Sequence, residues 1–334
     1  MNIGIIGAGS WGTALAIYIA RLNHLVKLWI YEDDVYKMIK ESRENAVYLP
    51  SFKLSENIIA EKKMIDAIES CEVIIVSVPS EYFRNTVKQL KDNIPDNAFF
   101  ISATKGIEND TYKRMSEVLN EELHIGQERI GVLSGPSFAK EVALGYPTAV
   151  VIASSNKKAS MVVQKELSSR TFRIYGNEDV IGVELGGSLK NINAIAAGII
   201  DGLGYGNNTI AALITRGLAE MMRLAKAMNA KPETLSGLSG LGDLVLTCTS
   251  SLSRNRTVGI KLGQGFKLPE ILGSMRMIAE GISTSKAVIH LKDTYHAEMP
   301  IVEQIYNILY LNKEPKKAID ELMLRDLKEE FLPL

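Results

Sequence analysis

Cysteine is scarce in this chain of 334 residues: only Cys71 and Cys248 are present, and neither stands in a Cys-x-x-Cys pair. We therefore expect neither a disulfide framework nor a structural zinc site, and we expect a reducing, cytoplasmic location. The four histidines lack the spacing of metal ligands, so no metal is expected. None of them ends a predicted strand or lies in a glycine-rich motif, which argues against a histidine as catalytic base.

The chain also lacks an excess of charge, because its 38 basic and 39 acidic side chains nearly cancel. This balance gives no general attraction to nucleic acid or to an anionic membrane surface. Its longest apolar run, residues 192–200, is interrupted by Asn193 and is much shorter than the ~20 residues of a membrane span. The first residues show no signal-peptide pattern. We expect no nucleic-acid partner, no membrane span and no export.

The most informative feature that is present is the opening sequence MNIGIIGAGSWG, in which an apolar run leads into Gly7, Gly9 and Gly12. β-branched residues before the glycines and helix formers after them predict a strand, a turn and a helix. Gly7 permits the tight turn, Gly9 lets the backbone approach a pyrophosphate, and Gly12 lets the helix pack closely on the strand. N–H groups of the first helical turn then face the phosphates.

A carboxylate completes this dinucleotide-binding fingerprint, since Glu32 stands twenty residues past Gly12 and follows the apolar strand of residues 25–31. A glutamate accepts hydrogen bonds from a ribose 2′-hydroxyl but repels a 2′-phosphate. No arginine lies nearby in the stretch Trp29-Ile-Tyr-Glu-Asp-Asp34. We therefore expect NAD as cofactor, with NADH preferred to NADPH and NADP as the weaker alternative. The simpler alternative to dinucleotide binding is that the three glycines only tighten the corner between a strand and a helix and bind no ligand.

A chain of this length is expected to form two domains. Alternating strands and helices predict an α/β fold with a doubly wound, mostly parallel Rossmann-type sheet in residues 1–180. From about Asn177 helical patterns take over, which predicts an all-α substrate-binding domain in residues 181–334. The predicted later strands are residues 72–78, 98–102, 129–133 and 148–152, and the predicted helices are residues 178–201, 210–228, 268–272, 284–291, 299–311 and 314–330.

Lys190 is the first candidate for chemistry. It lies in a predicted helix, and the small residues three, four or seven positions away on the same face predict room for a ligand beside the ammonium group. These residues are Gly186, Gly187, Asn193, Ala194 and Ala197. A lysine partly withdrawn from water at such a place has a lowered pKa and can donate a proton near neutral pH. The alternative is an ordinary solvated helix lysine.

Two further segments follow predicted strands, where the loops of a parallel sheet bind ligands. Lys105 comes after the strand at residues 98–102 and is expected at the carboxyl edge of the sheet; otherwise it is a surface lysine. The turn of residues 134–137 contains Pro136, which suits the first turn of a helix. It is either a substrate-binding turn or a capped helix start.

The sequence Ser253-Arg-Asn-Arg256 concentrates two guanidinium groups in four residues. Arginine forks match phosphate oxygens, so a phosphate-bearing substrate is the implied partner. A solvated helix cap is the simpler alternative, and one short basic cluster is poor support for nucleic acid. Asp243 lies on a glycine-defined loop and can pair with a lysine or a substrate hydroxyl, or act as an ordinary N-cap.

Besides the glycine loop, the chain contains Thr104-Lys-Gly106, residues 135–142, Leu189-Lys-Asn191, residues 240–249 and Ser253-Arg-Asn-Arg256, in this order. Together these motifs span nearly the whole chain and closely resemble the NAD(P)-dependent glycerol-3-phosphate dehydrogenase family. The resemblance implies reversible hydride transfer between a nicotinamide and dihydroxyacetone phosphate. The product is sn-glycerol 3-phosphate, which supplies the backbone of phospholipids.

Carried over position by position, the resemblance implies that Lys190 is the proton donor and acceptor, with Lys105 and Asp243 as its catalytic partners. The expected cofactor contacts are Gly7, Gly9, Ser10, Trp11, Gly12, Tyr31, Glu32, Lys105, Ala139, Arg254, Ile278 and Glu280. The expected substrate contacts are Lys105, Gly135, Ser137, Lys190, Asp243, Ser253, Arg254 and Asn255.

Two other interpretations remain open at this point. A two-domain dehydrogenase of the 3-hydroxyacid or 6-phosphogluconate type would share the glycine loop, but not Ser253-Arg-Asn-Arg256 together with Gly240-Leu-Gly-Asp243. A regulator that binds NADH without turnover is disfavoured by the retention of Lys190, Lys105 and Asp243. Long apolar helices such as residues 210–228 favour a homodimer.

Overall fold

The computed structural model describes residues 1–275, 278–327 and 329–330, and the chain divides by its internal contacts into two compact units. The sheet unit comprises Met1–Thr104 and Met115–Val180. The helical unit comprises Lys105–Arg114 and Ile181–Leu334. The segment Lys105–Arg114 thus lies with the helical unit, although its position in the sequence suggested the first domain.

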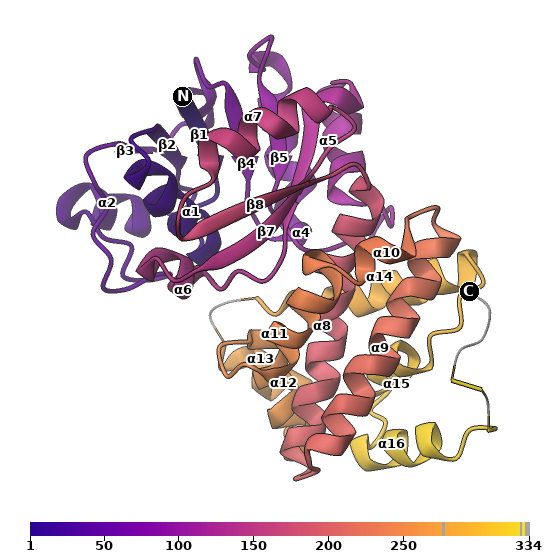
Figure 1. Cartoon of the computed structure of the whole chain (residues 1–334). Coiled ribbons are helices and arrows are strands. Elements are labelled where there is room, and N and C mark those ends of the chain that lie inside the picture. Colours follow the sequence, from indigo (N-terminus) through magenta and orange to yellow (C-terminus); the bar gives the residue numbers. More distant parts are fainter. Residues whose placement is uncertain (276–277, 328, 331–334) are drawn as a thin grey trace. The chain divides into compact units, whose positions relative to one another are not determined.

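The sheet unit is built on eight strands in the order β3-β2-β1-β4-β5-β6-β7-β8 (Figure 1). Neighbouring strands are parallel except β6 and β7, which are antiparallel. This confirms the predicted doubly wound, mostly parallel sheet. The strand order turns back at β1, so the carboxyl end of β1 is the place where such sheets bind ligands. The strands are β1 Asn2–Ile6, β2 Leu25–Trp29, β3 Ile58–Glu61, β4 Val73–Val76, β5 Phe99–Ser102, β6 Ile130–Ser134, β7 Thr148–Ala153 and β8 Phe172–Asn177.

Both faces of the sheet are covered by helices, because successive side chains of a strand point to opposite faces. In β4, Val73 and Ile75 belong to a core that includes residues of α1 and α7, whereas Ile74 and Val76 belong to a second core with residues of α4 and α5. Continuous apolar runs such as that of β4 are typical of strands buried on both faces. The helices are α1 Ser10–Arg21, α2 Asp33–Ser42, α3 Met64–Ile68, α4 Ser80–Val87, α5 Met115–Leu123, α6 Ala139–Leu144 and α7 Lys157–Leu167.

The sequence pattern missed β3 and β8, which form the two edges of the sheet. In β8, exposed Arg173 and Tyr175 alternate with buried Phe172 and Ile174. An edge strand of this kind lacks the apolar run that marks the central strands, and β3 is only four residues long. Their position at the edges of the sheet therefore explains why these two strands could not be predicted from apolar runs.

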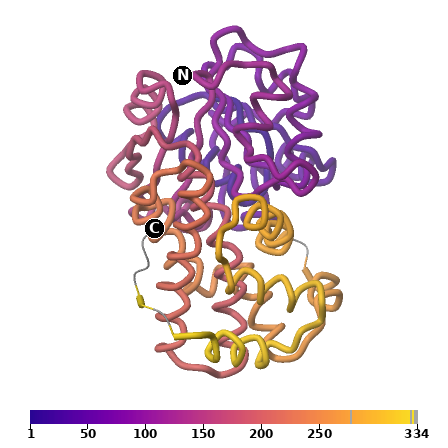
Figure 2. Tube along the Cα trace, turned by 90° about the vertical axis from the view of Figure 1, so that its right-hand side faces the viewer, coloured from indigo at the N-terminus to yellow at the C-terminus, as the bar shows by residue number. Residues whose placement is uncertain are grey.

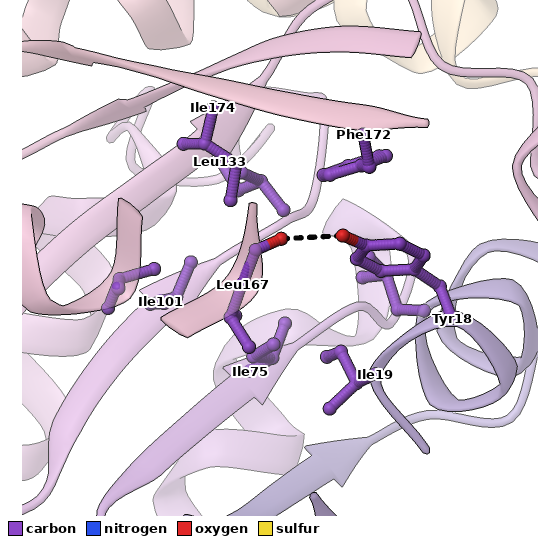
Figure 3. Close-up of a pocket in the computed structure, with 10 residues that line it drawn as sticks. Tyr18, Ile19, Ile75, Ile101, Leu133, Leu167, Phe172 and Ile174 are labelled. Carbon is purple, nitrogen blue, oxygen red and sulfur yellow. Dashed lines mark hydrogen bonds between the residues drawn. The ribbon is translucent and has the colours of Figure 1, made fainter. Parts of the chain in front are cut away.

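The first core contains a cavity of about 10 Å³ between α1, α7 and the sheet (Figure 3). Its lining is apolar apart from the hydroxyl of Tyr18, whose Oη donates a 2.7 Å hydrogen bond to the carbonyl oxygen of Leu167. This space is about one water molecule in size and offers too few polar partners to hold one. It is a packing void of the core and not a ligand pocket.

The helical unit confirms the predicted all-α second half of the chain. Its longest helices, α8 and α9, lie side by side (Figure 1; Figure 2). The two helices are in contact at Gly217 of α9, where a Cβ would come within 2.2 Å of Asn193 Oδ1 of α8. No helix in the described part of the chain is both long and apolar enough to cross a membrane. The helices are α8 Val180–Gly202, α9 Asn207–Ala227, α10 Pro232–Leu235, α11 Asp243–Thr249, α12 Arg254–Gly263, α13 Leu268–Gly273, α14 Glu280–Thr294, α15 Pro300–Tyr310 and α16 Pro315–Met323.

The sequence pattern missed three helices of this unit, α10, α11 and α12, which have four, seven and ten residues. It also extended the last helix too far, since α16 ends at Met323 and does not reach residue 330. Lys328 of that predicted segment lies outside the described residues.

Candidate active site

The glycine loop between β1 and α1 has the geometry of a phosphate cradle. Gly7 has a φ of +112°, and a Cβ at Gly12 would lie 1.9 Å from the carbonyl oxygen of Gly7. The fold itself therefore requires glycine at these two positions. At Gly9, by contrast, a Cβ would meet no atom within 4 Å. The fold does not explain this third glycine, whose missing side chain leaves open space for a ligand to approach the backbone.

Hydrogen-bond donors stand at the start of α1, directly after Gly9. Gly9 is the N-cap of α1 and offers no side chain to the free N–H groups of the first turn. The indole Nε1 of Trp11 is buried and has no hydrogen-bond partner among the described atoms. Such donors at a helix N-terminus, together with the helix dipole, attract an anion. The loop thus fits the pyrophosphate of a dinucleotide.

The loop of residues 43–57 holds the cradle in place. Asn45 Nδ2 donates to the carbonyl oxygen of Ala8 at 2.7 Å and to Thr13 Oγ1 at 2.8 Å. Ser10 Oγ donates to the carbonyl oxygen of Tyr48 at 2.7 Å, which joins this loop to the predicted pyrophosphate contact. The sequence analysis did not identify Asn45 or Tyr48, because neither stands at a position that helical or strand periodicity marks.

Tyr48 also fixes the acidic residue after β2. Its Oη donates a 2.7 Å hydrogen bond to Glu32 Oε1, so the carboxylate is held in one orientation. The side chain of Tyr31 beside it is 73% exposed and available to a ligand. This places both predicted cofactor residues at the carboxyl end of β2, next to β1 in the sheet.

The turn after β6 differs in detail from the prediction. Gly135 has a φ of +131°, and a Cβ there would lie 3.0 Å from Val150 Cα. Ser137 Oγ donates a 2.9 Å hydrogen bond to the carbonyl oxygen of Gly135. Pro136 does not lie in the first turn of a helix, since α6 begins only at Ala139. The reason is that the turn first reverses the chain through the left-handed conformation of Gly135.

In the helical unit, Lys190 and Lys105 share one buried carboxylate. Lys190 Nζ lies 2.8 Å from Asp243 Oδ1, and Lys105 Nζ lies 2.7 Å from Asp243 Oδ2. The side chains of Lys190 and Asp243 are 7% and 1% exposed. Three residues from distant parts of the sequence thus form one cluster. Lys105 lies in this cluster as part of the helical unit.

Thr247 is a fourth member of this cluster that the sequence analysis did not assign. Its Oγ1 donates to the carbonyl oxygen of Asp243 at 2.6 Å, one helical turn earlier, and accepts a hydrogen bond from Lys190 Nζ at 2.7 Å. The spacing of four residues from Asp243 in a short helix is the sequence signal that could have found it.

Glycine positions bring Asp243 against the helix that carries Lys190. A Cβ at Gly186 of α8 would lie 2.6 Å from the carbonyl oxygen of Ser239, and one at Gly240 would lie 2.0 Å from that of Leu235. The wide turn Leu238–Gly242 therefore packs directly on α8, and α11 starts at Asp243. At Gly186 itself, the backbone of this turn fills the space that the absence of a side chain leaves.

Burial and neighbouring charges shift the pKa values of both Lys190 and Asp243. Burial lowers the pKa of Lys190 to about 8, even though the carboxylate of Asp243 opposes this shift. Burial would raise the pKa of Asp243, but the ammonium groups of Lys105 and Lys190 outweigh it and hold that pKa below its usual range. The cluster therefore combines an ionised carboxylate with a lysine that can give and take a proton near neutral pH.

The remaining predicted residues gather at the start of α12 and α14. Ser253 is the N-cap of α12, where its Oγ accepts a hydrogen bond from the N–H of Arg256 at 3.2 Å. Arg256 Nη2 lies 3.0 Å from Asp201 Oδ2, whereas Arg254 is exposed. Of the two guanidinium groups in the motif, that of Arg254 is thus more accessible to a phosphate.

Asn255 uses both ends of its amide within the protein. Its Nδ2 donates to Asn191 Oδ1 at 2.9 Å, and its Oδ1 accepts the N–H of Gly281 at 3.0 Å. It therefore joins the residue after Lys190 to the first turn of α14, which begins at Glu280. The preceding Ile278 is half-buried, and Met277 of the same motif lies outside the described residues.

Comparison with known proteins agrees with these features. The family model described as the N-terminus of NAD-dependent glycerol-3-phosphate dehydrogenase matches residues 2–160, and that for the C-terminus matches residues 179–320. This chain belongs to that family. The family assignment confirms the expected enzyme class and NAD(P) as its cofactor, and it decides against the two other interpretations that the sequence had left open.

Several glycerol-3-phosphate dehydrogenases are similar to this one over nearly their whole length. The NAD(P)⁺ enzyme of Citrifermentans bemidjiense is 50% identical over 330 residues, which cover 98% of both chains. That of Syntrophotalea carbinolica is 49% identical over 332 residues, which cover 99% of this chain and all of the relative. The crystal structure of the Coxiella burnetii enzyme has a TM-score of 0.93 at 42% identity and covers 97% of this chain and 99% of its own.

Proposed function

We propose that this glycerol-3-phosphate dehydrogenase reduces dihydroxyacetone phosphate reversibly to sn-glycerol 3-phosphate and that Lys190 supplies the proton. The observation that carries this proposal is the hydrogen bonding of Lys190. An ammonium group has three N–H donors, and Asp243 and Thr247 take two of them. The third has no acceptor in the described part of the chain, so it can donate to a ketone oxygen.

The proton transfer follows from the change in charge during reduction. A bound nicotinamide would supply the hydride for the carbonyl carbon. Negative charge then develops on the ketone oxygen, and Lys190 Nζ donates a proton to it, which leaves a neutral amine. In the reverse direction, the neutral amine accepts the proton of the alcohol. A pKa of about 8 allows both forms of Lys190 to be populated near neutral pH.

The neighbouring residues position this proton donor and bind the substrate. Asp243 orients the ammonium groups of Lys190 and Lys105, and the charge of Lys105 helps to keep the pKa of Lys190 low. The exposed guanidinium of Arg254 provides a fork for the phosphate. By resemblance to the family, Ser253, Asn255, Gly135 and Ser137 complete the expected substrate contacts.

The cofactor is held by the sheet unit in this proposal. Gly7, Gly9 and Gly12 with Ser10 and Trp11 receive the pyrophosphate, and Tyr31 and Glu32 receive the adenosine. The orientation of Glu32 by Tyr48 suits acceptance of a ribose 2′-hydroxyl, so we propose that NADH is preferred to NADPH. By resemblance, Lys105, Ala139, Arg254, Ile278 and Glu280 complete the cofactor contacts. Comparing kcat/KM for the two cofactors tests the preference, and equal or better use of NADPH would reject it.

We also propose a role for each domain and a role for the enzyme in the cell. Residues 1–180 form the dinucleotide-binding domain and residues 181–334 form the substrate-binding domain. Lys105 contributes to the substrate site although it belongs to the first range. The enzyme acts in the cytoplasm as a homodimer and supplies the glycerol backbone for phospholipids. The buried free thiols of Cys71 and Cys248 fit a reducing compartment. Analytical ultracentrifugation tests the dimer, and a monomer at micromolar concentration would reject it.

A spectrophotometric assay tests the reaction itself. Oxidation of NADH is followed after addition of dihydroxyacetone phosphate, of dihydroxyacetone without phosphate, or of a 3-oxoacid. We expect rapid oxidation only with the phosphorylated ketone. Comparable rates without the phosphate would contradict the role of Arg254, and turnover of the 3-oxoacid alone would contradict the proposed substrate.

A further inference from the structure

Lys62 places an ammonium group beside the residues expected to recognise the adenosine ribose. It directly follows β3, which pairs in parallel with β2, so Lys62 lies at the same carboxyl edge of the sheet as Tyr31. Its Nζ lies 2.6 Å from Asp33 Oδ1 and also donates to the carbonyl oxygen of Tyr31. Its own carbonyl oxygen accepts a 3.1 Å hydrogen bond from Trp29 Nε1, so the main chain of Lys62 is tied to β2.

Residues 29–34, which follow the second strand in the sequence, contain no basic residue. Lys62 was missed because it is about thirty residues further along the chain and reaches this place through the pairing of two strands. It changes the electrostatics of the site, since the carboxylates of Glu32, Asp33 and Asp34 would otherwise oppose any additional negative charge.

The ammonium group of Lys62 is available to a further acceptor. Asp33 and the Tyr31 carbonyl take two of its three donors, and no acceptor for the third is found in the described ranges. The side chain of Lys62 is 38% exposed, and that of Asp33 is 79% exposed. An ion pair so open to solvent is weak, and a stronger anion can compete with the carboxylate.

We propose that Lys62 is a second determinant of cofactor choice: it binds the 2′-phosphate of NADP(H), and Asp33 restrains it by occupying its ammonium group. A 2′-phosphate offers three acceptor oxygens and close to two negative charges, more than one carboxylate does. Glu32 favours the 2′-hydroxyl of NADH, while Lys62 keeps the affinity for NADPH from falling further. This inference rests on the proposed cofactor position in the sheet unit.

Binding measurements on Lys62→Met test the first half of the inference. Isothermal titration calorimetry with NADH and NADPH gives both Kd values without any turnover. We expect the Kd for NADPH to rise about tenfold, because a charge-assisted hydrogen bond is lost, and the Kd for NADH to change less than twofold. Lys63→Met is the matched control, since Lys63 is the next residue, is exposed and has no ion pair with any described residue. It should change neither value.

A double-mutant cycle tests the restraint by Asp33. Asp33→Asn should lower the Kd for NADPH several-fold, and the combination with Lys62→Met should remove most of this gain. Asp34→Asn removes the same charge from the next position without releasing Lys62 and should give a clearly smaller gain. An equal gain in Asp34→Asn, or a gain that persists in the double variant, would show that only net charge matters and would overturn the inference.

The same titrations separate this inference from the function on which it rests. Wild-type protein that binds neither dinucleotide would overturn the cofactor site in the sheet unit. Wild-type protein that binds both, with an unchanged ratio of the two Kd values in Lys62→Met, would overturn only the role of Lys62.

Discussion

The two units of the molecule provide different chemical groups to the candidate site. The sheet unit provides main-chain N–H groups at the start of α1, next to glycines 7, 9 and 12, which have no side chain. The helical unit uses the charged side chains of Lys190 and Asp243, withdrawn from water. A main-chain site requires only the correct local conformation, whereas a charged side-chain site requires the packing of distant elements. Substitutions should therefore affect the two sites in different ways.

The largest effect is expected in the helical unit. Lys190→Met should lower kcat for ketone reduction about 10³-fold, because general-acid catalysis by a positioned group contributes on that order. The Kd for NADH should stay within twofold of wild type, since the proposed pyrophosphate contacts belong to the sheet unit. Steady-state kinetics and calorimetry measure the two quantities separately.

Lys316→Met serves as the matched control, since Lys316 is an exposed lysine of α16 in the same unit. It should leave both quantities unchanged. A kcat of Lys190→Met within tenfold of wild type would show that Lys190 is not the proton donor, and Lys105 would be the next candidate for that role.

The next effect is expected in the sheet unit and concerns binding. Gly9→Ala should raise the Kd for NADH on the order of hundredfold, because its methyl group takes the place of the pyrophosphate. Its thermal midpoint without cofactor should be unchanged, since a Cβ at Gly9 meets no atom within 4 Å. Gly12→Ala, whose Cβ would lie 1.9 Å from the Gly7 oxygen, should instead lower that midpoint clearly.

Thermal melts and calorimetry of these two variants distinguish a ligand-imposed glycine from a fold-imposed one. Unchanged NADH affinity in Gly9→Ala would show that the open space beside this residue does not receive the cofactor.

A smaller effect is expected at the edge of the charged cluster. Thr247→Val removes the hydroxyl that accepts a hydrogen bond from Lys190, and it should lower kcat about tenfold with little change in the KM for NADH. Thr249→Val is the matched control in the same helix, because among the described residues its exposed hydroxyl bonds only to the carbonyl oxygen of Val245 one turn earlier. An equal change in kcat in the two variants would show that Thr247 has only a structural role.

This difference between a local main-chain site and a side-chain site formed by distant segments also explains what could be predicted from the sequence. The glycine spacing and Glu32 predicted the cradle, because a strand, a turn and a helix form it within thirty-two residues. The apolar runs predicted the central strands. They could not predict the edge strand β8, in which exposed and buried residues alternate.

The charged cluster could be predicted only in part. The sequence and its resemblance to a family identified Lys190, Lys105 and Asp243, but not Thr247, whose role depends on the short helix α11. The backbone packing against Gly186 and the ion pair of Lys62 with Asp33 both depend on tertiary contacts between segments far apart in the chain. No local spacing records such contacts.

The pH dependence of kcat tests the central role of Lys190 most directly, measured for wild type and Asp243→Asn. Ketone reduction needs the protonated amine, so in wild type its rate should be constant at low pH and fall above the pKa of about 8. Alcohol oxidation should show the opposite trend. Because the charge of Asp243 raises the pKa of Lys190, the break should move to lower pH in Asp243→Asn. A break at the same pH in both proteins, or none near pH 8, would contradict the assignment.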